Sequence, residues 1–382
     1  MIPAMATVHP LIFEPIFRPK VWGGRNLERL FDKRLPGGAA IGESWECVDL
    51  DDTRSVVAAG PARGRTLSDL VSDWSADLLG RAPPFEGRFP LLIKFLDAVE
   101  PLSVQVHPDA ETARRLGGGA RPKEEAFYVV EAKPGGSIYL DVRPGVAADA
   151  FADAVRAGEV ETVLQQVPAQ PGRCHHVPPG TVHALGAGVV VAEIETPSDT
   201  TYRIYDWGRT RPAGDAGLHV EQALAALKLG PPRAAPPRAH VGGLFTTVTR
   251  MVDAEAFTIE KVRFIEGMEM PIPYAEMVIW IVLEGRGAVA YRGGEQPFAR
   301  GDVVVLPAAL RDGLLRTQSD CVWLEVTLPV SSDLADLPRP PADVLRAPDG
   351  SPAAPVPLTI NVPRADRDAA RGSKKQGPAR ER

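Results

Sequence analysis

Two neighbouring stretches decide the fold, FPLLIKFLDA at residues 89–98 and LSVQVHPD at residues 102–109. Each is a short apolar run near a proline, a pattern typical of β-strands. Similar runs recur along the chain, as AFYVVEAKPGG, VVVAEIETP, MVIWIVLEGRG, DVVVLPA and CVWLEVTL. Strands separated so regularly by turns predict a mainly β protein made of sandwiches or barrels.

Three stretches have the apolar spacing of helices instead. The first runs from Leu67 to Leu78 behind Thr66, a residue type that suits the N-cap. The second covers residues 151–164 and the third covers residues 219–230. We therefore expect a few helices that flank the strands.

Breaks in composition divide the chain. Residues 229–240, LGPPRAAPPRAH, contain four prolines and predict an interdomain linker. From residue 331 onward prolines recur while the apolar spacing is lost. We predict a first domain at 1–235, a second at 236–330 and a disordered tail at 331–382, with a weak polyanion-binding tail as the alternative.

Charge and cysteine content restrict the class of protein. The 382 residues include 43 basic and 49 acidic ones, a formal net charge of −6. An acidic body argues against nucleic-acid binding, which needs clustered Lys and Arg, and the chain lacks the run of about 18 apolar residues that a membrane helix needs. The three cysteines are widely spaced, which predicts a cytoplasmic protein. The first residues lack a basic cluster followed by a long apolar run, so we expect no signal peptide.

A short pattern occurs twice. Residues 172–183 read G-x5-P-x-G-x2-H, and residues 301–312 keep the spacing as G-x5-P-x-A-x2-D. Asp312 thus stands where the first copy has His183. We interpret this as a repeated unit whose second copy has lost a metal ligand, so that the second domain is metal-free.

The candidate metal ligands come from separate strands. In LSVQVHPD, alternation places Ser103, Gln105 and His107 on one face of a strand. Buried polar groups are costly unless they are paired, and a bound metal would pair them. His183 follows a P-x-G turn, and a Glu pair at 124–125 opens another strand. Two imidazoles, one carboxylate and an amide oxygen suit zinc, or iron or manganese, although each histidine alone would more often be structural.

Seven segments in this order resemble the type I mannose-6-phosphate isomerase family, particularly its shorter bacterial form. They are VWGG (21–24), GESWE (42–46), FPLLIKFLDA, LSVQVHPD, the K-x-E of 123–125, PPGTVHAL (178–185) and SDTTYRIYDWGR (198–209). The resemblance extends from about residue 8 to 230 and more weakly to 330. It implies two cupin (jelly-roll) barrels, flanked by a few helices and followed by the tail.

The resemblance also implies roles for single residues. One zinc ion per chain would be held by Gln105, His107, Glu125 and His183, with Glu124 as the near alternative to Glu125. Neighbouring strand residues point to opposite faces, so only one of the two glutamates should reach the metal.

Arg203 would be catalytic, since a fixed guanidinium can stabilise the negative charge of an enediolate; the alternative is a salt bridge to Asp199 or Asp206. The expected substrate-binding residues are Ser103, Lys94, Lys123, Trp22 and Glu193. Lys94 as a plain surface residue is an equally open interpretation.

The expected function is zinc-dependent interconversion of mannose 6-phosphate and fructose 6-phosphate through an enediolate. The alternatives are a cupin isomerase for another phosphosugar and a non-catalytic sugar-binding cupin. The base that moves the proton stays open between a zinc-bound water and an acidic residue such as Glu193. We expect a phosphosugar as the only partner of a monomer or weak homodimer.

Overall fold

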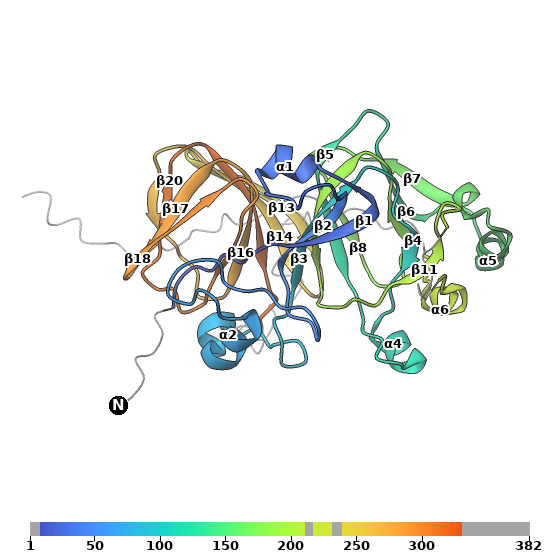
Figure 1. The fold of residues 1–382 in the computed structure, drawn as a ribbon, viewed down its shortest axis with the longest axis horizontal. Coiled ribbons are helices and arrows are strands. Elements are labelled where there is room, and N and C mark those ends of the chain that lie inside the picture. Colours follow the sequence, from blue (N-terminus) through green and yellow to red (C-terminus); the bar gives the residue numbers. More distant parts are fainter. Residues whose placement is uncertain (1–7, 211–216, 231–238, 331–382) are drawn as a thin grey trace, which may run out of the picture. The chain divides into compact units, whose positions relative to one another are not determined.

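The computed structural model describes residues 8–210, 217–230 and 239–330 (Figure 1). The predicted tail at 331–382 and the central part of the predicted linker at 229–240 lie outside the described residues. Up to Val330 the chain forms one compact unit. The predicted boundary near residue 235 stays a prediction.

The first half of the chain contains two antiparallel sheets. The six-stranded sheet has the order β1 (Ile16–Gly24), β2 (Ile41–Cys47), β3 (Leu92–Ala98), β10 (Val189–Glu195), β5 (Glu125–Ala132) and β8 (Cys174–Val177). The five-stranded sheet has the order β11 (Tyr202–Tyr205), β4 (Val104–Val106), β9 (His183–Leu185), β6 (Ser137–Val142) and β7 (Leu164–Pro168).

The second half repeats this arrangement. Its six-stranded sheet has the order β12 (His240–Gly242), β13 (Thr246–Asp253), β14 (Thr258–Phe264), β21 (Cys321–Thr327), β16 (Val278–Glu284) and β19 (Val303–Leu306). The smaller sheet has the order β15 (Glu269–Pro271), β20 (Leu314–Thr317), β17 (Arg286–Tyr291) and β18 (Gly294–Ala299). The order of strands β12–β21 matches that of strands β1–β10 throughout, and β11 is an additional strand of the first half. For example, β10 lies between β3 and β5, and β21 lies between β14 and β16. This match supports the predicted repeat, and the prediction of a mainly β protein is confirmed.

Short helices flank the sheets: α1 (Asn26–Phe31), α2 (Leu67–Trp74), α3 (Ala76–Leu79), α4 (Ala110–Leu116), α5 (Ala148–Ala157) and α6 (Val220–Ala226). Thr66 caps α2 as expected, since it accepts a hydrogen bond from the Asp69 N–H in a capping box. The helix predicted as far as Leu78 is broken at Ser75, whose φ of 42° is incompatible with an α-helix, and α3 begins anew. The helix predicted over 151–164 ends at Ala157, because Gly158 adopts a left-handed conformation.

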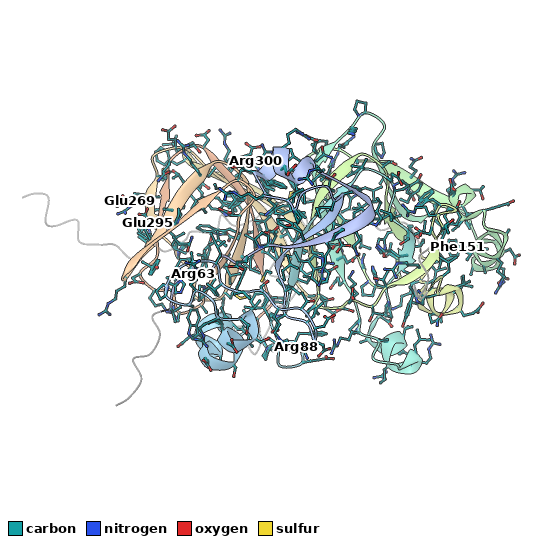
Figure 2. The ribbon with its side chains drawn as sticks, viewed as in Figure 1. Arg63, Arg88, Phe151, Glu269, Glu295 and Arg300 are labelled. Atoms are coloured by element: carbon teal, nitrogen blue, oxygen red, sulfur yellow. The ribbon has the colours of Figure 1, made fainter. Side chains whose placement is uncertain are left out.

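Apolar clusters determine which strand faces point inward. Residues of both six-stranded sheets share the largest cluster, which includes Phe95 and Ile194 from the first half and Ile279 and Val326 from the second. The outer face of the five-stranded sheet is covered by helices α5 and α6. The fully buried Phe151 of α5 (Figure 2) belongs to the cluster that lies there, together with Val104, Val106 and Ala184. The alternate residues of those strands are therefore left to face the interior of the first half.

The interior of the second half is filled with apolar side chains. Trp280 and Trp323 stack there, with ring centroids 4.5 Å apart, and Phe298 packs edge-on against both. None of the described helices has the length and apolar character needed to cross a membrane.

Candidate active site

Three buried side chains converge in the first half from three separate strands. Glu125 opens β5, His183 opens β9, and His107 follows β4. The His107 Nε2 atom lies 3.3 Å from Glu125 Oε1, and the His183 Nε2 atom lies 3.1 Å from Glu125 Oε2. None of the three is more than 2% exposed. Their ligand atoms lie within 4.8 Å of one another, so this group could hold a metal ion.

Backbone carbonyls orient both imidazoles. His107 Nδ1 donates to the carbonyl of Thr200 (2.8 Å), and His183 Nδ1 donates to that of Thr181 (3.0 Å). These bonds leave each Nε2 as the lone-pair nitrogen that faces Glu125, the arrangement that metal-binding histidines require. Neither Nε2 has a hydrogen-bond partner among the described residues. Burial lowers the pKa of His107 to about 4, so its imidazole is neutral at physiological pH.

The two neighbouring glutamates point in opposite directions. Burial alone would raise the pKa of Glu125, but His107 and Lys123 hold it well below its usual range. Glu124 faces the other side of the strand, where Oε1 lies 2.7 Å from His176 Nε2. Its Oε2 accepts a hydrogen bond (3.1 Å) from the N–H of Ala256, in the turn between β13 and β14. Glu125 therefore belongs to the buried group, and Glu124 connects the two halves of the chain.

Gln105 and Arg203 lie beside this group. Gln105 pairs with His183 on one side and with Arg203 on the other, and residues directly opposite in a sheet share a face. Within the described residues the Arg203 guanidinium forms no ion pair, while Asp206 pairs with Arg209. The salt-bridge interpretation of Arg203 is therefore wrong for this structure.

Two lysines lie buried near the same end of β10. Lys94 Nζ is 3.0 Å from Glu193 Oε2 and also lies over the ring of Trp45. Lys123 Nζ is 2.5 Å from Glu125 Oε1. Burial opposes their charge, but the surrounding carboxylates raise the pKa of both lysines above the usual range. Lys94 is not the surface residue that one interpretation allowed.

The remaining predicted residues lie at different depths. Glu193 is buried on β10 against Lys94, whereas Ser103 is partly exposed just before β4. Trp22 packs in an apolar cluster with Leu96 and Ala98 on β3. Their role in binding stays a prediction.

Comparison with known proteins places the chain in a family. Residues 11–134 match the model for the catalytic domain of type I phosphomannose isomerase. The chain is 31% identical over 320 residues to mannose-6-phosphate isomerase ManA of Bacillus subtilis (strain 168), covering 83% of this chain and 98% of that protein. The chain belongs to the type I phosphomannose isomerase family. This confirms the predicted family and identifies the protein as an isomerase.

Further comparisons agree with this family. The mannose-6-phosphate isomerase of Streptococcus mutans serotype c (strain ATCC 700610 / UA159) is 33% identical over 307 residues, covering 79% of this chain and 93% of that protein. The crystal structure of the mannose 6-phosphate isomerase of Bacillus subtilis superposes with a TM-score of 0.76 at 29% identity, covering 84% and 99% of the two chains. A phosphomannose isomerase of similar fold (TM-score 0.65, 16% identity, 84% and 100% covered) was solved with zinc and yttrium bound.

One buried charged residue of this isomerase has no counterpart among the sequence predictions. Glu195 lies two positions after Glu193 on β10 and contacts both Lys94 and Lys123. The alternation in VVVAEIE would have placed Glu195 on the same face as Glu193.

Proposed function

We propose that the protein interconverts mannose 6-phosphate and fructose 6-phosphate, using one zinc ion held by Gln105, His107, Glu125 and His183. The observation that carries the proposal is the buried group of His107, Glu125 and His183, whose two Nε2 atoms face one carboxylate and lack hydrogen-bond partners among the described residues. It lies beside two buried, charged lysines in a member of a phosphomannose isomerase family.

The residues present suit zinc. Two neutral imidazoles and a carboxylate are a common ligand set for catalytic zinc, which keeps a further position open. Gln105 is placed on the same face by its pairing with His183. When bound, the ion would supply Lewis acidity toward the sugar oxygens.

The chain's own groups would bind the substrate and compensate its charge. Lys94 and Lys123 offer ammonium donors to a phosphate dianion, and Ser103 offers a hydroxyl. Moving a proton between C1 and C2 generates negative charge on the sugar oxygens, which the Arg203 guanidinium would stabilise, since it has no ion-pair partner among the described residues. Glu193 is the buried carboxylate that we propose as the candidate proton carrier, and Trp22 would contribute to the pocket.

A turnover assay tests the proposal. Mannose 6-phosphate should be converted, chelation should abolish the conversion, and His107→Ala should lose both zinc and activity. Full activity of the metal-free His107→Ala protein would overturn the proposed role of zinc. Faster turnover of glucose 6-phosphate would favour another phosphosugar, and calorimetric binding without turnover would indicate a sugar-binding protein.

The setting of the enzyme is also proposed. None of the three cysteines, all of which lie in the part of the chain that the structure describes, forms a disulfide, which suits a reducing compartment, and we propose that the enzyme is cytoplasmic. We propose a monomer or weak homodimer, without nucleic-acid or membrane partners, in keeping with the net charge of −6.

A further inference from the structure

A line of alternating charges lies buried in the first half of the chain. It runs from Glu193 through Lys94, Glu195 and Lys123 to Glu125. Glu195 is the middle member, with Oε1 2.6 Å from Lys94 Nζ and Oε2 2.7 Å from Lys123 Nζ. A single carboxyl group therefore contacts two ammonium groups through separate oxygens.

The sheet fixes the position of this carboxyl group. Glu195 ends β10, directly opposite Leu92 of β3 on one side and Glu125 of β5 on the other. Lys94 lies on β3, and Lys123 lies just before β5. Glu195 is completely buried. Its strand, β10, thus lies between β3, which carries Lys94, and β5, which begins just after Lys123.

The contacts of Glu195 explain how two cations can be buried together. Like charges repel strongly where water is excluded, so neighbouring ammonium groups would separate or lose a proton. Burial and the Glu193 charge raise the pKa of Glu195 well above its usual range, while the two lysine ammonium groups, at 2.7 and 2.6 Å, oppose that shift. Each ammonium contacts its own oxygen of Glu195, so a single carboxyl group stabilises both cations in these positions.

We propose that Glu195 is a positioning residue, which holds Lys94 and Lys123 together as a pair that binds the phosphate of the substrate. This inference rests on the proposed function, in which the two lysines are phosphate contacts. A phosphate dianion has two charges and several acceptor oxygens, so a preorganised pair of ammonium groups binds it better than two groups that are free to separate. The phosphate takes no part in the proton transfer, so loss of the pair should weaken binding more than turnover.

The test compares Glu195→Gln with wild type in the metal-loaded, full-length protein. Glutamine keeps the shape but removes the charge. We expect the KM for mannose 6-phosphate and the calorimetric Kd for inorganic phosphate each to rise about tenfold or more, with kcat changed less than about threefold. Glu325→Gln is the matched control, because Glu325 is a half-buried carboxylate on β21 that accepts a hydrogen bond from Tyr274. It should leave KM and Kd unchanged.

A second variant covers the case in which Glu195→Gln does not fold. Glu195→Asp keeps the charge but is one methylene shorter, so it should reach only one ammonium and raise KM and Kd to an intermediate degree. Unchanged or lower values in a folded variant, or no phosphate binding by wild type, would overturn the proposal. If wild type binds phosphate but does not convert mannose 6-phosphate, the proposed function fails, while the calorimetric comparison still decides the role of Glu195.

Discussion

Exchanging each of two adjacent glutamates for glutamine should have opposite consequences. Glu125 is fully buried against both imidazoles and Lys123, whereas Glu124 joins His176 to Ala256 of the second half. We expect Glu125→Gln to lose zinc and activity, and Glu124→Gln to retain both but to be less stable. The two variants differ by one position and have the same chemistry, so each is the control for the other.

The magnitudes follow from the contacts. Changing an outer-shell partner of a metal typically weakens metal binding 10–100-fold, so loss of the charged ligand Glu125 should weaken zinc binding by at least about 100-fold. Glu124 makes two bonds as a charged acceptor, each contributing about 1.5–3 kcal/mol in general. The Glu124 and His176 side chains are 11% and 31% exposed, which reduces that contribution, and we expect a loss of about 2 kcal/mol in the free energy of unfolding. The melting temperature should then fall by roughly 3 °C, because the entropy of unfolding grows with the size of the compact unit.

Elemental analysis after dialysis, urea denaturation and a coupled isomerase assay would measure these three quantities. Loss of zinc from Glu124→Gln, with retention by Glu125→Gln, would show that the strand presents the other glutamate to the metal. Retention of zinc by both variants would contradict the expected dependence of zinc binding on the charge of Glu125.

Four further predictions concern other parts of the molecule. Dialysis against a chelator should abolish activity and lower the melting temperature, and added zinc should restore both, since a ligand that binds only the folded state stabilises it; full activity without metal would contradict this. Burial lowers the pKa of His9, whose Nε2 accepts a hydrogen bond from the Ala62 N–H (3.1 Å). The stability that neutral His9 contributes should therefore be complete above pH 6.5 and be lost as the pH falls below 6.5. This pH dependence of the free energy of unfolding should disappear in His9→Gln. Trp323→Ala should cost about 3–5 kcal/mol in urea denaturation with KM unchanged, and a loss below about 1 kcal/mol would show that the second half is not packed as described. Truncation after Val330 should leave kcat/KM unchanged, and a large loss would assign a function to the tail.

The sequence predicted the parts of the site that depend on strand alternation. The period of two in LSVQVHPD places Gln105 on one face, and the structure pairs Gln105 with both His183 and Arg203. The same rule separates Glu124 from Glu125. Applied to VVVAEIE, the rule also places Glu195 on the same face as Glu193, but this stretch lies outside the seven segments that resemble the family.

Other features leave no trace in the pattern of side chains. The carbonyls of Thr200 and Thr181 orient the two imidazoles, and every residue has a carbonyl, so no residue type reveals them. The helical spacing continued past Trp74, but the break at Ser75 depends on one backbone angle. The contact between the two six-stranded sheets also went unpredicted, because strands apolar on both faces do not reveal which face meets which partner.

The place of β10 between β3 and β5 has a consequence for synthesis and folding. During translation β3 and β5 leave the ribosome well before β10, so neither can complete its hydrogen bonds in the large sheet until Glu195 has emerged. Pairing between strands distant in sequence is slow, and unpaired strand edges stay exposed meanwhile. Lys94, Lys123 and Glu125 should therefore be brought together only when the first half has been synthesised, which makes the newly made chain most prone to aggregation shortly before that point.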